Sequence, residues 1–147
     1  GRLVTLRGDG ERSFETLLAG FVAAQVGRYP GTDDLRTAVE RHTGDDWGWF
    51  FDQWVYGCAV PSYRWKSTVD AIDEGGYRVV LEVTQSDVPD DFRMDVPVRL
   101  ELEGGETREV LVTIERPRQT VEIEVESRPR EVIFNPDHAV LARTGKL

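Results

Sequence analysis

Histidines, which commonly bind metals or carry protons, are scarce in this 147-residue sequence. Only His42 and His138 occur, and neither has a second ligand at the spacing that places two side chains on one helix face. His42 falls on a predicted helix face with Leu35, Ala38 and Val39, so we expect a partly buried histidine with a structural role. His138 follows Asn-Pro-Asp and is expected in a solvated turn.

Carboxylates gather in the segment DVPDD, which contains Asp87, Asp90 and Asp91. Their oxygens could bind calcium, but the spacing differs from that of an EF-hand, so an acidic loop is expected. Cys58 is the sole cysteine, which excludes an intrachain disulfide, and its aromatic neighbours favour a small buried hydrophobe. No nucleophile elbow or phosphate-binding glycine loop occurs, so we predict no catalytic, cofactor-binding or metal-binding residue in this chain.

Six aromatic residues crowd the segment DDWGWFFDQWVYG, residues 45–57. On a helical wheel of about 100° per residue they divide between two faces. One broad face holds Trp47, Phe50, Phe51, Trp54, Val55 and Cys58. Trp49 and Tyr56 lie nearly opposite. Three roles are open: packing in a core and an interface, stacking on a sugar or other ligand, and recognition of a protein. Packing is the expected role, because aromatic residues at helical spacing are usually packed.

The elements that would position these residues change character along the chain. Residues 1–58 are predicted to form about three helices. The first has one apolar face formed at three- and four-residue spacing by Phe14, Leu17, Leu18, Phe21 and Val22. We expect Ser13 to cap its start and Gly27 to follow its end.

Capping signals mark two further helices. Thr32 is expected to cap the second, with Asp33 and Asp34 in its first turn and Gly44 at its end. Asp45 or Asp46 is expected to cap the third, which would carry the aromatic cluster and stop at Gly57. Three short helices bury too little surface to be stable alone, because even a 60-residue domain buries only about 60% of its unfolded surface. This part is therefore expected to belong to a larger helical domain.

From Tyr63 onward apolar residues alternate with Glu, Arg and Thr, which is the period of strands. Alternating runs cover residues 77–83, 96–102, 109–114, 120–125 and 131–134, and Gly104-Gly105 signals a hairpin. Six or seven such strands predict an antiparallel β-sandwich of immunoglobulin-like (Ig-like) form over residues 59–147. The expected fold class is α+β, with a helical segment at 1–58.

The formal net charge is −9 and basic residues are interleaved with acidic ones. Because nucleic-acid binding depends on a basic stripe that neutralises phosphates, nucleic acid is not an expected partner. An anionic membrane surface is disfavoured for the same reason. No apolar run approaches the roughly 20 residues of a membrane span.

The stretch TDDLRTAVERHTGDDWGWFFDQWVYGCAVPSYRW, residues 32–65, resembles the end of the catalytic domain in zinc aminopeptidases of the aminopeptidase N type. That family shows a Thr-x-Asp helix start, Glu-x-x-[Ser/Thr]-Gly-x-Asp, a Phe-Phe-x-x-Trp segment, and Gly-x-Pro before a β-sandwich. The matching residues are Thr32, Asp34, Leu35, Glu40, Thr43, Gly44, Asp46, Trp49, Phe50, Phe51, Gln53, Trp54 and Pro61. Flanking segments GERSFETLLAGFV and VIFNPDHAVLAR are also similar to the family. Ala59 departs from it, standing where glycine is usual.

The resemblance implies a parent protein that hydrolyses peptides with a zinc-activated water. The family's zinc ligands lie in H-E-x-x-H plus a later Glu, and this chain contains neither. We therefore expect a non-catalytic C-terminal portion that scaffolds the zinc domain, with zinc only in the intact parent. Its expected partners are the rest of the catalytic domain and, through the helical half, a second copy covering the second aromatic face. The alternatives are a stand-alone module that binds protein or glycan and, more remotely, an independent small hydrolase.

Overall fold

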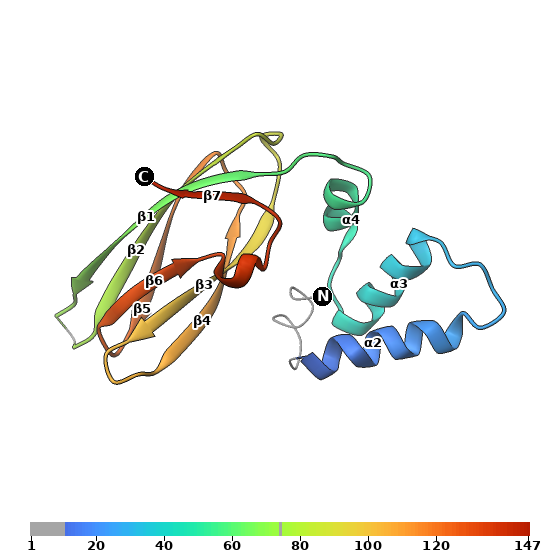
Figure 1. The fold of residues 1–147 in the computed structure, drawn as a ribbon, viewed down its shortest axis with the longest axis horizontal. Helices are drawn as coiled ribbons and strands as arrows, with labels where there is room; N and C mark the ends of the chain where they lie inside the picture. Colours follow the sequence, from blue (N-terminus) through green and yellow to red (C-terminus); the bar gives the residue numbers. More distant parts are fainter. Residues whose placement is uncertain (1–10, 74) are drawn as a thin grey trace. The chain divides into compact units, whose positions relative to one another are not determined.

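The computed structural model describes residues 11–73 and 75–147. By internal contacts the chain divides between Cys58 and Ala59 into a helical unit and a strand unit. The described residues form three α-helices followed by one mixed and one antiparallel β-sheet, so the fold class is α+β (Figure 1). In that part of the chain no helix has the length and apolar character needed to cross a membrane.

Helix α2 spans Glu11–Ala24. Ser13 lies inside it, so the predicted cap is wrong, and the good helix formers Glu11 and Arg12 carry the helix past it. Leu17 is buried, whereas Leu18 and Val22 of the predicted apolar face are exposed. The helix ends at Ala24, three residues before the predicted Gly27, which closes the following turn in the left-handed region with φ 74°.

Helix α3 spans Thr32–Thr43, and its N-cap is Gly31 rather than the predicted Thr32. The reason is that the Asp34 carboxylate accepts a hydrogen bond from the Gly31 N–H at 2.7 Å, which starts the helix one residue earlier. The predicted end is confirmed: Gly44 has φ 76° and its N–H donates to the Glu40 carbonyl at 2.9 Å.

Helix α4 spans only Gly48–Trp54. Its N-cap is Trp47 rather than the predicted Asp45 or Asp46, although the Asp46 Oδ1 accepts a hydrogen bond from the Gly48 N–H at 2.8 Å. The predicted end at Gly57 is wrong by three residues, since both Val55 and Tyr56 donate their N–H groups to the Phe51 carbonyl and close the helix. Gly57 follows so closely that a Cβ there would lie 2.5 Å from the Gln53 carbonyl oxygen.

The strand unit contains seven described strands and one short 3-10 turn. In chain order these are β1 Ser62–Ala71, β2 Tyr77–Ser86, β3 Met94–Leu102, β4 Thr107–Ile114, β5 Arg118–Val125, β6 Pro129–Phe134, η1 Pro136–His138 and β7 Arg143–Lys146. One sheet has the order β5-β2-β1-β7 and the other β4-β3-β6. The purely antiparallel prediction is wrong for β7, which pairs with β1 in parallel, with Ser62 opposite Arg143.

Both sheets contribute alternate side chains to a buried core. On β2 these are Val79, Leu81 and Val83, and on β3 they are Met94, Val96, Val98 and Leu100. Rings join the sheets: Tyr63 and Trp65 of β1 lie 5.5 and 5.8 Å, centroid to centroid, from Phe134 of β6. The alternation read from the sequence therefore marks the packed face of each sheet.

The connections follow local turn chemistry. The predicted hairpin is confirmed, since β3 and β4 pair antiparallel and Gly104 and Gly105 have φ 103° and 87°. After β6, Asn135 is buried with φ 53°, and its side chain both accepts from the Val140 N–H and donates to the Val140 carbonyl, at 2.8 and 2.9 Å. This pair of bonds folds the chain back so that β7 can reach β1.

Candidate interaction surfaces and the predicted site residues

The centre of the helical unit is Trp47, which is 2% exposed. Its indole Nε1–H donates to Thr43 Oγ1 at 2.8 Å, and its backbone N–H donates to Glu40 Oε1 at 3.2 Å. Arg36 donates to the same Glu40 oxygen at 2.8 Å, and this hydrogen bond is the main reason that the pKa of Arg36 is raised. Thr43 in turn donates to the Val39 carbonyl at 3.0 Å, so the end of α3 and the start of α4 share one polar frame.

Aromatic rings pack around Trp47 within the segment 47–54. Trp49 stacks on Trp47 with centroids 6.3 Å apart, and Phe50 meets Trp47 edge-on at 5.5 Å. Phe50 also stacks on Trp54 at 6.4 Å, and Phe51 is 5% exposed. The expected packing role is confirmed for Trp47 and Phe51.

The predicted opposition of Trp47 and Trp49 is wrong. Trp47 precedes the helix, with φ −108° and ψ 7°, so helical-wheel geometry does not extend to it. Trp49 is half-buried as a result. Of the second face, Tyr56 remains 61% exposed, and its hydroxyl contacts Asp33 Oδ1 at 3.4 Å.

Cys58 is exposed, so its predicted role as a buried hydrophobe is wrong. The helix ends at Trp54, so the helical-wheel position that placed Cys58 beside Phe51 and Trp54 does not extend to it. Val55, placed on the same predicted face, is also 46% exposed.

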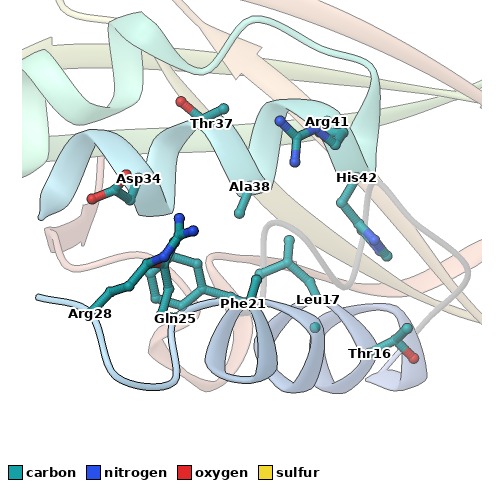
Figure 2. A pocket seen from close by; sticks show the side chains of 12 residues that line it. Thr16, Leu17, Phe21, Gln25, Arg28, Asp34, Thr37, Ala38, Arg41 and His42 are labelled. Atoms are coloured by element: carbon teal, nitrogen blue, oxygen red, sulfur yellow. The ribbon is translucent and has the colours of Figure 1, made fainter. Parts of the chain in front are cut away.

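A groove of about 530 Å³ runs between α2 and α3. Figure 2 shows Arg28 and Asp34 at one end of it and Thr16 and His42 at the other. Its apolar lining consists of Leu17, Phe21, Ala24 and Ala38. His42 is exposed at the edge of this groove, so the expected partial burial is wrong.

The acidic loop does not assemble into a cation site among the described residues. Asp87 accepts a hydrogen bond from Ser62 Oγ at 2.5 Å and lies 3.9 Å from Arg143 Nη1, while Asp90 and Asp91 are exposed. In residues 11–73 and 75–147 no three His, Cys, Asp or Glu side chains are grouped so as to hold a metal ion. The described residues therefore provide no ligand set that fits the zinc implied by the resemblance.

His138 is exposed at the end of η1, as expected of a turn residue. Its neighbour Asp137 pairs with Arg99 Nη2 at 2.5 Å, and this bond is the first cause of the raised pKa of Arg99. His138 and Asp137 have positive φ, of 51° and 56° respectively. The turn is therefore held by the Arg99–Asp137 ion pair and by Asn135.

Sequence reasoning missed the buried polar residues of the strand unit. Tyr63 and Gln85 face each other across β1 and β2 and are 1% and 5% exposed. Burial raises the pKa of Tyr63 above its ordinary range. Asp95 is 2% exposed and accepts from Thr113 Oγ1 at 2.6 Å. The sole signal for Asp95 and Gln85 was a polar residue inside an otherwise apolar strand.

The described residues thus form a packed aromatic cluster and networks of hydrogen-bonded polar side chains, and no three His, Cys, Asp or Glu among them are grouped as metal ligands. Comparison of the chain with protein-family models finds no match, and comparison with curated proteins finds no relative of significant similarity.

Proposed function

We propose that the chain is a non-catalytic part of a zinc metallopeptidase of the aminopeptidase N type. In this proposal the helical unit completes the zinc-binding catalytic domain of the parent. The strand unit is an Ig-like β-sandwich that follows it. The role of both units is to support the peptidase domain, and peptide hydrolysis belongs to residues elsewhere in the parent.

The observation that carries the proposal is that family-like residues supply the hydrogen bonds that set the ends of α3 and the start of α4. Asp34 bonds the start of α3, Gly44 closes its end, and Asp46 bonds the start of α4. Glu40 and Thr43 hold the backbone and indole of Trp47. Each of these residues forms a hydrogen bond with a backbone or side-chain group of the α3–α4 segment. Such a pattern supports the proposal that this segment has the same local structure as in the family.

The remaining motif residues fit the same view. Phe50, Phe51 and Trp54 contact one another or Trp47, and Gln53 Nε2 donates to the Trp49 carbonyl at 2.8 Å. None of these contacts arranges a proton donor, an acceptor and a nucleophile toward one point. This packing supports the proposal that the stretch braces a neighbouring site.

The sheet orders support the sandwich part of the proposal. Two sheets of four and three strands, joined by rings of β1 and β6 over an apolar core, have the layer composition of Ig-like domains. Strands β4 and β5 are edge strands of different sheets, and hydrogen bonds from side chains to the backbone link them. Arg108 donates to the Glu124 carbonyl at 2.9 Å, and Gln119 donates to the Thr113 carbonyl at 2.7 Å.

The gene supplies the first test. The coding sequence that precedes Gly1 should contain H-E-x-x-H followed by a second-ligand Glu, and the longer protein should hydrolyse aminoacyl anilides. Substituting that motif's Glu by Gln should abolish turnover while zinc stays bound, because this Glu is the general base. A preceding sequence without any metal-ligand motif would overturn the proposal of a peptidase parent.

The second candidate is a binding module, favoured by the exposure of Val55 and Tyr56 beside the aromatic cluster. It predicts saturable binding on a glycan or peptide array that Trp49→Ala abolishes. Thr37→Ala, an exposed substitution on α3, is the matched control. If neither array shows binding dependent on Trp49, this candidate fails.

A further inference from the structure

The groove between α2 and α3 has an apolar floor that the described residues leave open. Leu17 is buried at its base, whereas Phe21 and Ala38 are only half-buried and Ala24 is exposed. Its volume of about 530 Å³ lies in the range of ordinary binding sites. A third helix is the element that normally covers apolar surface between two helices.

The middle of the groove is open down to the backbone of α2. Gly20 lies in the interior of that helix and lines the groove. A glycine at such a position weakens a helix, and a Cβ added here would meet nothing within 4 Å. The space above Gly20 therefore allows the side chains of a docking helix to approach α2 closely.

The charged side chains of the groove are mainly cationic. Arg28 lies at one end, and Arg41 lies with His42 toward the other (Figure 2). Among the described residues neither arginine side chain has an ion-pair partner. Asp34 is the sole acid among the described lining residues, and its carboxylate accepts from the Gly31 N–H. On a chain of net charge −9, this groove favours a partner that carries carboxylates.

We propose that the α2–α3 groove binds an amphipathic helix of a partner protein, with an apolar face that is flanked at both ends by acidic residues. The apolar side chains of this helix pack over Leu17 and Ala38, and its carboxylates meet Arg28 and Arg41. Asp34, at the Arg28 end, and Arg41 are seven residues apart on α3, which corresponds to roughly 10 Å along the helix. Acidic residues two to three turns apart in the partner fit that separation.

Charge distinguishes this occupant from three others. Residues 1–10 of the chain contain two arginines and a single acid, so they match the cationic groove poorly. A second copy that met this groove through its own groove would bring Arg28 and Arg41 against like charges. A fatty acid brings one carboxylate, whereas the groove has an arginine toward each end.

The first experiment measures binding of a labelled synthetic helix to the 147-residue chain by fluorescence anisotropy. The probe is an 18-residue peptide with Leu at three- and four-residue spacing and two Glu at each end, and its matched control has Lys in place of Glu. The Glu peptide should bind with a dissociation constant in the micromolar range and more weakly in high salt. The Lys peptide should bind at least about tenfold more weakly. Equal binding of the two peptides overturns the proposal.

Charge reversal locates the contact. Arg28→Glu and Arg41→Glu should each weaken binding of the Glu peptide about fivefold and strengthen binding of the Lys peptide. Arg64→Glu makes the same change at an exposed residue of the strand unit that does not line the groove, and it should alter neither affinity by more than about twofold. If the groove variants behave like Arg64→Glu, the proposal is wrong.

A steric variant tests the apolar part of the groove. Gly20→Leu should abolish measurable binding, because the new side chain occupies the open space while leucine favours the helix. Ala23→Leu is the matched control, since it is exposed on α2 and does not line the groove, and it should bind as the native chain does. Both variants must keep the native far-ultraviolet circular dichroism. Undiminished binding by folded Gly20→Leu contradicts the proposed site.

The other occupants give different results in the same assays. Binding of laurate without binding of the Glu peptide would assign the groove to fatty acids. A dimer of the chain alone that Gly20→Leu abolishes in sedimentation would assign it to a second copy. Either result overturns the proposal. The proposal does not rest on the proposed function, and its readouts need neither zinc nor turnover, so the two can fail separately.

Discussion

At the scale of single residues, the hydrogen bonds around Trp47 account for two residues of the family-like pattern, Glu40 and Thr43. Thr43 accepts from the indole and donates to the Val39 carbonyl, so one hydroxyl joins α3 to the start of α4. Glu40 holds both Arg36 and the Trp47 backbone. Glu40 and Thr43 lie about one helical turn apart because they bind the backbone N–H and the indole N–H of the same residue, Trp47. Their spacing therefore has a structural explanation.

Thr43→Val tests this frame because it keeps the side-chain shape and removes the oxygen that accepts from Trp47. We expect a loss of about 1–3 kcal/mol, the usual result of removing the acceptor of a buried donor. Urea unfolding followed by tryptophan fluorescence measures it. Thr37→Val, whose exposed hydroxyl bonds the Asp33 carbonyl, should change stability by less than about 0.5 kcal/mol. Equal losses in both variants would show that the indole bond contributes nothing.

Tyr63 gives the pH dependence of the strand unit. Its pKa in the folded state lies above the ordinary value of 10.0 because burial disfavours the phenolate. The unfolded chain therefore loses this proton first, so stability is intact below pH 10 and falls as the pH rises above it. The slope from this residue should approach about 1.4 kcal/mol per pH unit.

Tyr63→Phe should remove that alkaline slope. Below pH 9 the variant should be at least as stable as the native chain, since the Tyr63 hydroxyl has no hydrogen-bond partner within the described residues. Denaturant midpoints between pH 8 and 11 compare the two proteins. Parallel profiles for both would mean that Tyr63 ionises freely in the folded state.

At the scale of elements, the periodicity of apolar residues located the helices and most strands, because burial of one face dictates that spacing. The ends were less predictable. The start of α3 is set by the Gly31 N–H, which donates to the Asp34 carboxylate. The end of α4 is set by the Phe51 carbonyl, which accepts from the N–H groups of both Val55 and Tyr56. β7 was missed because Arg-Thr-Gly-Lys is exposed throughout and has no apolar alternation.

Two glycines provide opposite tests of these elements. Gly57→Ala should destabilise the helical unit by about 1–3 kcal/mol, because the new Cβ would lie 2.5 Å from the Gln53 carbonyl oxygen. Gly20→Ala should stabilise α2 by about 1 kcal/mol, since a Cβ there meets nothing within 4 Å. Thermal melts followed at 222 nm measure both. Shifts of the same sign would contradict the assigned geometry.

At the scale of the whole molecule, the change of apolar period near residue 60 coincides with the division between Cys58 and Ala59. Periodicity could show that much because it reports burial within each unit. It could not show the parallel β1–β7 pair, the exposure of His42 and Cys58, or the buried Asp95 and Gln85. These features depend on tertiary contacts between segments far apart in the sequence, which apolar periodicity does not specify.

The most direct test of the central claim is to purify, side by side, the 147-residue chain and the longer protein that the proposed function expects its gene to encode. Zinc per chain is then measured by mass spectrometry, and hydrolysis of an aminoacyl anilide is measured with each. The account predicts one zinc and chelator-sensitive turnover for the longer protein, and neither for the 147-residue chain. Stoichiometric zinc or turnover in the 147-residue chain itself would contradict it.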